Sequence, residues 1–204
     1  MIYKKDKLNF DGFNIDFLAK KFNTPIYCYS FKRLKENIIN FKKYFKEINP
    51  LICFSVKSNS NIKILNEIKK LDLGADVVSV GELMKALKAG IKPKKIVFSG
   101  VGKTTSEIKY AVDKKILLIN TESENEILEI EKIAKLKKKN VDIGIRLNPN
   151  TDAKTINQIS TGKKEDKFGV NEKVFLKLVK YLKNSKHLNL KCLSVHIGSQ
   201  ITSP

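Results

Sequence analysis

The chain has 204 residues, of which 42% are hydrophobic, and this is enough for one sizeable core. No apolar run is long enough to cross a bilayer, and the N-terminus lacks the apolar stretch of a signal peptide. Three widely spaced cysteines without a CxxC pair indicate reduced, buried thiols in predicted strands of a cytoplasmic protein, and they predict no metal site: Cys28, Cys53 and Cys192.

The formal net charge of +19 raises the question of a nucleic-acid partner. The basic residues are spread over the whole chain, and only two of them, Arg33 and Arg146, are arginines, whereas nucleic-acid readers favour the planar guanidinium. We therefore expect neither a nucleic-acid nor a membrane partner. A basic nucleic-acid-binding module stays open as an alternative, and it predicts a steep salt dependence of binding to any duplex.

Strand and helix patterns alternate along the chain. A strand-like stretch at 25–29 comes first, and apolar residues at helical spacing then predict a helix over 34–48. Short apolar runs predict strands at 51–56, 75–78, 96–98, 116–119, 141–147 and 192–195. Helices are predicted over 62–71, from about 83 to Gly90, after a cap at Thr105 or Ser106, after a capping box from Ser123 to Glu126, and over 174–182. A polar loop is predicted from Asn148 to about Gly169.

This β-then-α repeat is typical of a parallel α/β architecture, which closes either as a doubly wound sheet or as a (β/α)8 barrel. No GxGxxG motif follows the first strand, so the dinucleotide-binding doubly wound fold is disfavoured. A closed barrel needs eight strands and typically about 250 residues. We therefore expect a (β/α)8 TIM barrel that is truncated after about six strands, and we expect this chain alone to be inactive and poorly folded.

Polar residues lie at or near the carboxyl ends of four predicted strands: Lys57, Asp76, Arg146 and His196. Barrel enzymes place their reacting groups at these ends. A lysine ammonium at the mouth of a buried strand is costly unless it has a partner or loses its proton, and this is the environment of a lysine that forms a Schiff base. Singly, each residue has an ordinary structural explanation, but together they predict one functional rim.

At these residues the sequence resembles the alanine-racemase-type barrel decarboxylases, the family that acts on ornithine, diaminopimelate and arginine. Residues 54–59, with Lys57, resemble the pyridoxal-phosphate lysine motif of that family, and residues 74–83 and 98–104 resemble its second- and third-strand motifs. Within the family, the diaminopimelate decarboxylases are matched by residues 146–149, 160–162, 167–169 and 196–201. The resemblance runs from about Thr24 to the end of the chain.

The resemblance implies a cofactor, pyridoxal 5'-phosphate, and roles for five residues. Lys57 would hold the cofactor covalently and exchange it for the substrate amine. His196 would stack on the pyridine ring, and Ser199 would bind the phosphate. Asp76 and Arg146 would lie in the polar network around the lysine. A loop containing Ser160, Thr161 and Gly162 would cover the site and sense the substrate.

The implied reaction is decarboxylation of meso-2,6-diaminopimelate to L-lysine and carbon dioxide, catalysed by a cytoplasmic homodimer. Residues 1–30 would pack on a C-terminal β domain that this chain lacks, and residues 31–204 would form the partial cofactor-binding barrel. Two alternatives stay open within the fold: a related decarboxylase of ornithine, arginine or a carboxylated polyamine, and a non-catalytic barrel that binds pyridoxal phosphate.

Overall fold

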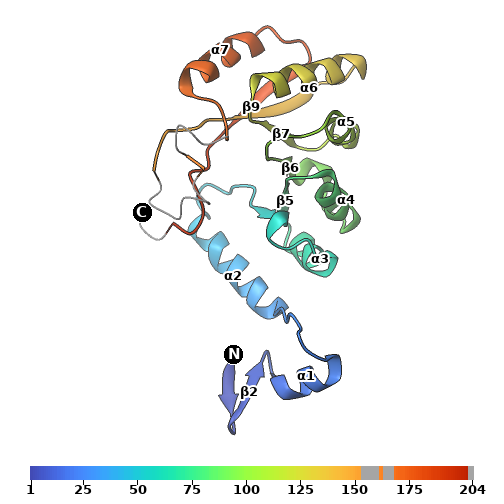
Figure 1. Cartoon of the computed structure of the whole chain (residues 1–204), viewed down its shortest axis with the longest axis vertical. Coiled ribbons are helices and arrows are strands. Elements are labelled where there is room, and N and C mark those ends of the chain that lie inside the picture. Colours follow the sequence, from blue (N-terminus) through green and yellow to red (C-terminus); the bar gives the residue numbers. More distant parts are fainter. Residues whose placement is uncertain (153–160, 163–167, 202–204) are drawn as a thin grey trace. The chain divides into compact units, whose positions relative to one another are not determined.

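The computed structural model describes residues 1–152, 161–162 and 168–201, so Ser160 lies outside the described residues (Figure 1). The chain divides into two units, Met1–Pro50 and Leu51–Pro204, and each is described by itself. Within the described ranges, no helix has the length and apolar character needed to cross a membrane.

The first unit contains a small antiparallel sheet and two helices. Strands β1 (Ile2–Lys4), β2 (Lys7–Phe10) and β3 (Phe13–Asn14) pair in that order, and helices α1 (Ile15–Phe22) and α2 (Phe31–Tyr44) follow. The side chains of Asn14 and Ser30 accept backbone N–H groups at the two helix starts, as polar N-caps do. The predicted strand at 25–29 is wrong. The segment is an irregular stretch that pairs with no strand among the described residues, and Tyr27 is 89% exposed.

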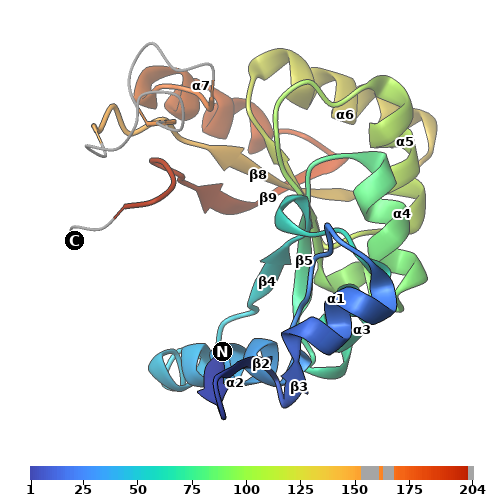
Figure 2. The same ribbon diagram turned by 60° about the horizontal axis from the view of Figure 1, so that its bottom comes forward.

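The second unit is built on six parallel strands that pair in chain order (Figure 2). They are β4 (Cys53–Ser55), β5 (Gly74–Val77), β6 (Ile96–Phe98), β7 (Leu118–Thr121), β8 (Val141–Arg146) and β9 (Leu188–Ser194). A doubly wound sheet reverses its strand order at a switch point, whereas this sheet does not. The order is that of successive β/α units of a barrel, so the predicted α/β class and the six predicted strands are confirmed.

Helices α3 (Ile62–Lys70), α4 (Val80–Lys88), α5 (Thr105–Lys114), α6 (Glu124–Leu136) and α7 (Glu172–Leu182) alternate with the strands, and Figure 2 shows α3 to α6 along one side of the curved sheet. The core lies between this side and the helices, where Ile143, Ile145 and Ile127 are fully buried. The start of α5 differs from the prediction. Its cap is Thr104, because Glu107 at the third helical position completes a capping box with that residue.

The cysteines do not all lie where the sequence predicts. Cys53 is in β4 and Cys192 is in β9, and both are half-buried, but Cys28 is exposed because its segment forms no strand. All three are free thiols. Burial raises the pKa of the Cys53 thiol to about 11, so this group is protonated at neutral pH.

Candidate active site

Lys57 lies just past the carboxyl end of β4, in a single 3-10 turn over Val56–Ser58. Val56 is fully buried and anchors the turn, and the Ser58 hydroxyl donates to the Ser55 carbonyl at 2.7 Å. The Lys57 side chain is exposed, so the burial cost expected from the sequence does not arise. Among the described residues its ammonium makes no hydrogen bond or ion pair, which leaves the amine available to react.

Asp76, in β5, is the half-buried carboxylate of the site. It accepts a hydrogen bond of 2.5 Å from the Ser99 hydroxyl at the end of β6. Burial raises the pKa of this carboxyl above its ordinary value of 3.8, whereas the Ser99 hydrogen bond and the charges of Lys57 and His196 act in the opposite direction. Three of the predicted residues therefore lie within electrostatic range of one another.

His196 follows β9 and is held by Thr161. The Thr161 hydroxyl donates to the His196 carbonyl at 2.9 Å, and its oxygen lies 2.7 Å from Nδ1 of the ring. Because the hydroxyl has one proton, the ring N–H at Nδ1 donates to Thr161, which leaves Nε2 as the unprotonated nitrogen of the neutral ring. Burial lowers the pKa of His196, and the charges of Arg146 and Lys57 lower it further.

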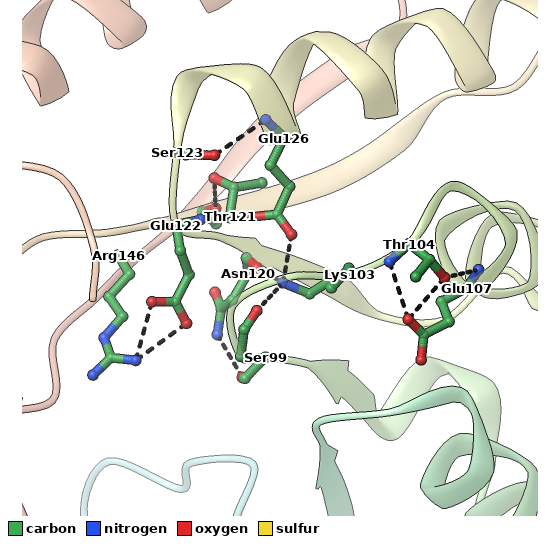
Figure 3. Close-up of polar contacts among 12 residues, drawn as sticks. Ser99, Lys103, Thr104, Glu107, Asn120, Thr121, Glu122, Ser123, Glu126 and Arg146 are labelled. Atoms are coloured by element: carbon green, nitrogen blue, oxygen red, sulfur yellow. Dashed lines mark hydrogen bonds and ion pairs between the residues drawn. The ribbon is translucent and has the colours of Figure 1, made fainter. Parts of the chain in front are cut away.

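Arg146, the last residue of β8, forms an ion pair with Glu122 (Figure 3). Its Nη1 donates to both carboxylate oxygens, at 3.1 and 3.2 Å, and the two side chains are only 13% and 3% exposed. Its Nη2 donates to the His196 carbonyl at 3.4 Å, and the guanidinium lies 4.7 Å from the centroid of the Phe168 ring. Arg146 therefore connects the end of β8 to Glu122, which follows β7, and to His196, which follows β9.

A second, largely buried ion pair lies beside this one (Figure 3). Lys103 is 1% exposed, and its ammonium donates to the carbonyls of Gly100 and Asn120, at 2.6 and 2.7 Å, and to Glu126 at 2.8 Å. All three of its protons have acceptors, so the buried charge is fully paired. The cluster connects the loop after β6 to β7 and to the first turn of α6.

The capping box predicted at the start of α6 is half formed. The Ser123 hydroxyl accepts the Glu126 N–H at 3.2 Å, as predicted. The Glu126 carboxylate does not return to Ser123. It accepts the Glu122 N–H at 2.7 Å and pairs with Lys103, because an unpaired buried ammonium would be far more costly than an unpaired N–H near solvent.

Several residues of the site were not predicted from the sequence: Ser99, Lys103, Asn120, Glu122 and Glu126. Glu122 gave a usable signal, since it is a carboxylate directly after the buried strand β7 and so occupies the rim position that marked the other site residues. Lys103 lies within residues 98–104, which resemble the third-strand motif of the family, but nothing distinguishes its role from that of other lysines in a lysine-rich chain.

The structure describes only part of the predicted loop and phosphate site. Gly162 is buried, and a Cβ atom there would lie 2.8 Å from the Thr151 carbonyl, so the close approach of the backbone requires glycine. Ser199 is exposed in a bend after β9. Within the described part of the chain, its hydroxyl makes no hydrogen bond with Lys57, Asp76 or Arg146.

We expect Glu122→Gln to lower the free energy of unfolding by about 2 kcal/mol, because the variant breaks a nearly buried, charge-assisted contact with Arg146. Glu122 also accepts the Gly169 N–H at 3.1 Å. Chemical denaturation monitored by circular dichroism would measure the loss. The matched control is Glu124→Gln, two residues away, which removes an exposed pair with Lys177 and should cost less than about 1 kcal/mol. Equal losses in the two variants would contradict the expectation.

The donor set fits pyridoxal phosphate. It combines an unpaired primary amine at Lys57, a carboxylate at Asp76 that balances positive charge, and an imidazole at His196 whose orientation is fixed by a hydrogen bond. A primary amine is the group with which lysine binds this cofactor covalently.

Comparison with known proteins gives a family and a group of relatives. Residues 31–204 match the family model described as pyridoxal-dependent decarboxylase, pyridoxal binding domain. The diaminopimelate decarboxylase of Helicobacter pylori (strain J99) is 48% identical over 189 residues, which are 93% of this chain and 47% of that protein. The diaminopimelate decarboxylase of Campylobacter jejuni is 47% identical over 90% of this chain. The chain spans about half the length of the curated relatives it matches.

The fold agrees with a solved structure. The crystal structure of Helicobacter pylori diaminopimelate decarboxylase complexed with L-lysine superimposes with a TM-score of 0.91 at 47% identity, over 93% of this chain and 48% of that one. The predicted alanine-racemase-type barrel and the predicted cofactor, pyridoxal phosphate, are therefore confirmed. The match covers every strand of the parallel sheet, and the chain belongs to the family of pyridoxal-dependent decarboxylases, with residues 31–204 as its pyridoxal-binding domain.

Proposed function

We propose that this protein catalyses the decarboxylation of meso-2,6-diaminopimelate to L-lysine and carbon dioxide. The observation that carries the proposal is the grouping of Lys57, Asp76 and His196 at the carboxyl ends of parallel strands. Identity of 48% to a diaminopimelate decarboxylase, over nearly the whole chain, supports this substrate.

Lys57 and His196 act on the reacting groups in this proposal. Lys57 Nζ is the primary amine that would hold the cofactor. When bound, pyridoxal phosphate supplies an electron sink for the carbanion left when carbon dioxide departs. His196 presents its ring to the cofactor, and the contacts with Thr161 support a fixed ring orientation. Both of these residues are predictions from the sequence.

Three further residues are proposed to bind the cofactor. Asp76 provides a carboxylate beside Lys57, and its negative charge partly opposes the lowering of the His196 pKa by burial. Arg146 contributes a planar guanidinium whose position depends on Glu122. Ser199 binds the phosphate through its hydroxyl.

The loop and the quaternary arrangement are also proposals. Ser160, Thr161 and Gly162 belong to a loop that covers the site, and the Thr161–His196 contact supports a connection between loop position and ring position. We further propose that the active protein is a cytoplasmic homodimer and that residues 1–30 pack on a β domain.

The test measures carbon dioxide release from four candidate substrates by the native protein with added pyridoxal phosphate: meso-2,6-diaminopimelate, L-ornithine, L-arginine and carboxyspermidine. We expect kcat/KM for meso-2,6-diaminopimelate to exceed the others by about a hundredfold or more. A site that binds the second amino-carboxylate end of diaminopimelate leaves its own polar groups unpaired with substrates that lack this end.

Each other outcome contradicts the proposal in a distinct way. A preference for ornithine, arginine or carboxyspermidine would identify a related decarboxylase. Cofactor binding without release of carbon dioxide from any substrate would identify a non-catalytic barrel. Retention of full activity in Lys57→Arg, which keeps the positive charge, would refute the role of the amine.

A further inference from the structure

A line of hydrogen bonds inside the sheet ends at the Asp76 carboxylate. The Asn120 side-chain N–H of β7 donates to the Ser99 hydroxyl at 3.2 Å, and the Ser99 hydroxyl donates to Asp76 Oδ1 at 2.5 Å. The Asn120 and Ser99 end of this line is visible in Figure 3. Asn120 is in β7, Ser99 directly follows β6 and Asp76 is in β5, so the line crosses the edge of the sheet from β7 to β5.

The Asn120 amide sets the direction of this line. A serine hydroxyl has one proton, and it accepts from a donor on one side while donating to an acceptor on the other. Because the Asn120 N–H approaches the Ser99 oxygen, the serine proton is directed to Asp76. An acceptor at position 120 would attract that proton away from Asp76.

Gly144 makes room for the amide. A Cβ atom at Gly144 would collide with Asn120 Oδ1, and this buried oxygen has no hydrogen-bond partner among the described residues. An unsatisfied buried oxygen costs free energy. Its retention is explained if the opposite side of the amide, the N–H that faces Ser99, has a function.

The charged and titratable groups around Asp76 come from every neighbouring element. Cys53 of β4 is protonated, whereas the charges of Lys57 and Lys103, and of His196 when it is protonated, favour the ionised carboxylate. Burial raises the pKa of Asp76 and is the largest influence on it, whereas these three groups lower it. The hydrogen bond from Ser99 is the largest of the influences that oppose burial.

We propose that Ser99 and Asn120 are positioning residues that keep the Asp76 carboxylate ionised and fixed in place. Among the described residues, neither makes a hydrogen bond with Lys57 or His196, so any effect on these two groups passes through Asp76. The catalytic meaning of this inference rests on the proposed function, but its test needs neither substrate nor turnover.

The test follows the Asp76 carboxyl by NMR across a pH titration, using native protein labelled with ¹³C at aspartate and assigned with Asp76→Asn. We expect the midpoint to move to higher pH in Ser99→Ala. At a fixed acidic pH the ratio of ionised to protonated Asp76 should fall about tenfold, the factor expected for loss of a charge-assisted hydrogen bond. Asn120→Asp should move the midpoint in the same direction, because its carboxylate takes the serine proton and adds a like charge.

Two controls separate this role from a merely structural one. Ser99→Thr keeps the hydroxyl and should restore the wild-type midpoint. Thr105→Ala removes an exposed hydroxyl that donates to Glu129 and should not move it. An unchanged Asp76 midpoint in folded Ser99→Ala overturns the inference. If Ser99→Ala does not fold, the nearly isosteric variant Asn120→Asp is used instead, and an unchanged Asp76 midpoint in that variant overturns the inference. A shifted midpoint without carbon dioxide release would refute the proposed reaction and leave this inference standing.

Discussion

Replacement of Lys57 by alanine should abolish the covalent attachment of pyridoxal phosphate and lower kcat/KM about a thousandfold or more, since a covalent catalyst that loses its reacting group keeps only what binding contributes. The absorbance of the bound cofactor should disappear with it. Borohydride reduction of the wild-type protein followed by peptide mapping should find the cofactor on Lys57. This mapping is necessary because exposed lysines are numerous in a chain with 40 lysines and arginines.

Two variants test whether the effect belongs to this amine. Lys57→Arg keeps the positive charge beside Asp76 but has no primary amine, so it should lose attachment as completely as the alanine variant does. Lys63→Ala removes an exposed lysine of α3, six residues further along the chain, and should leave attachment unchanged. Cofactor found on another lysine in the wild-type protein would refute the assignment of the site.

Replacement of Lys103 by methionine should give the largest loss of stability in this chain, about 3–5 kcal/mol in the free energy of unfolding. The lysine is 1% exposed, and its removal leaves the 9% exposed Glu126 carboxylate without its cation. Two main-chain carbonyls also lose their donor. Urea denaturation of the native protein would measure the change as a lower midpoint at constant slope.

A matched control is Lys137→Met, which removes the ion pair between Lys137 and Asp113. These two side chains are 28% and 48% exposed. Surface pairs of this kind contribute about 1 kcal/mol or less. Since Lys139 also pairs with Asp113, the carboxylate keeps one partner in this variant.

The double variant Lys103→Met with Glu126→Gln should recover part of the loss, because it leaves no buried charge unpaired. A loss in Lys103→Met no larger than in Lys137→Met would contradict a buried, fully paired ammonium.

Much of the fold could be predicted because the strands of a parallel sheet covered by helices are continuous apolar runs. The predicted strand at 96–98 coincides with β6, and the helix predicted over 62–71 coincides with α3 to within one residue. The stretch at 25–29 failed because short β propensity does not provide a partner strand. The 3-10 turn at Lys57 was also not predictable, since one turn leaves no periodicity in the sequence.

The predicted part of the site consists of residues that stand out at strand ends. Asp76 is a carboxylate within an apolar strand, and Arg146 is one of two arginines. Glu122 was recognisable as a carboxylate after a buried strand, but its contact with Arg146 was not. That contact, like the contact between Asn120 and Ser99, joins residues more than 20 positions apart and exists only because the sheet brings β7 beside β8 and β6.

The strictly sequential pairing of β4 to β9 has a consequence for how the chain acquires its structure. Each strand from β5 to β9 pairs with the strand that precedes it in the chain, so no strand pair in this sheet skips over a β/α unit. This topology allows assembly in the direction of synthesis, because each β/α unit that leaves the ribosome meets an edge strand already made. In that order Asp76 and Lys57 come together with the first two strands of the sheet, and His196 joins them after β9.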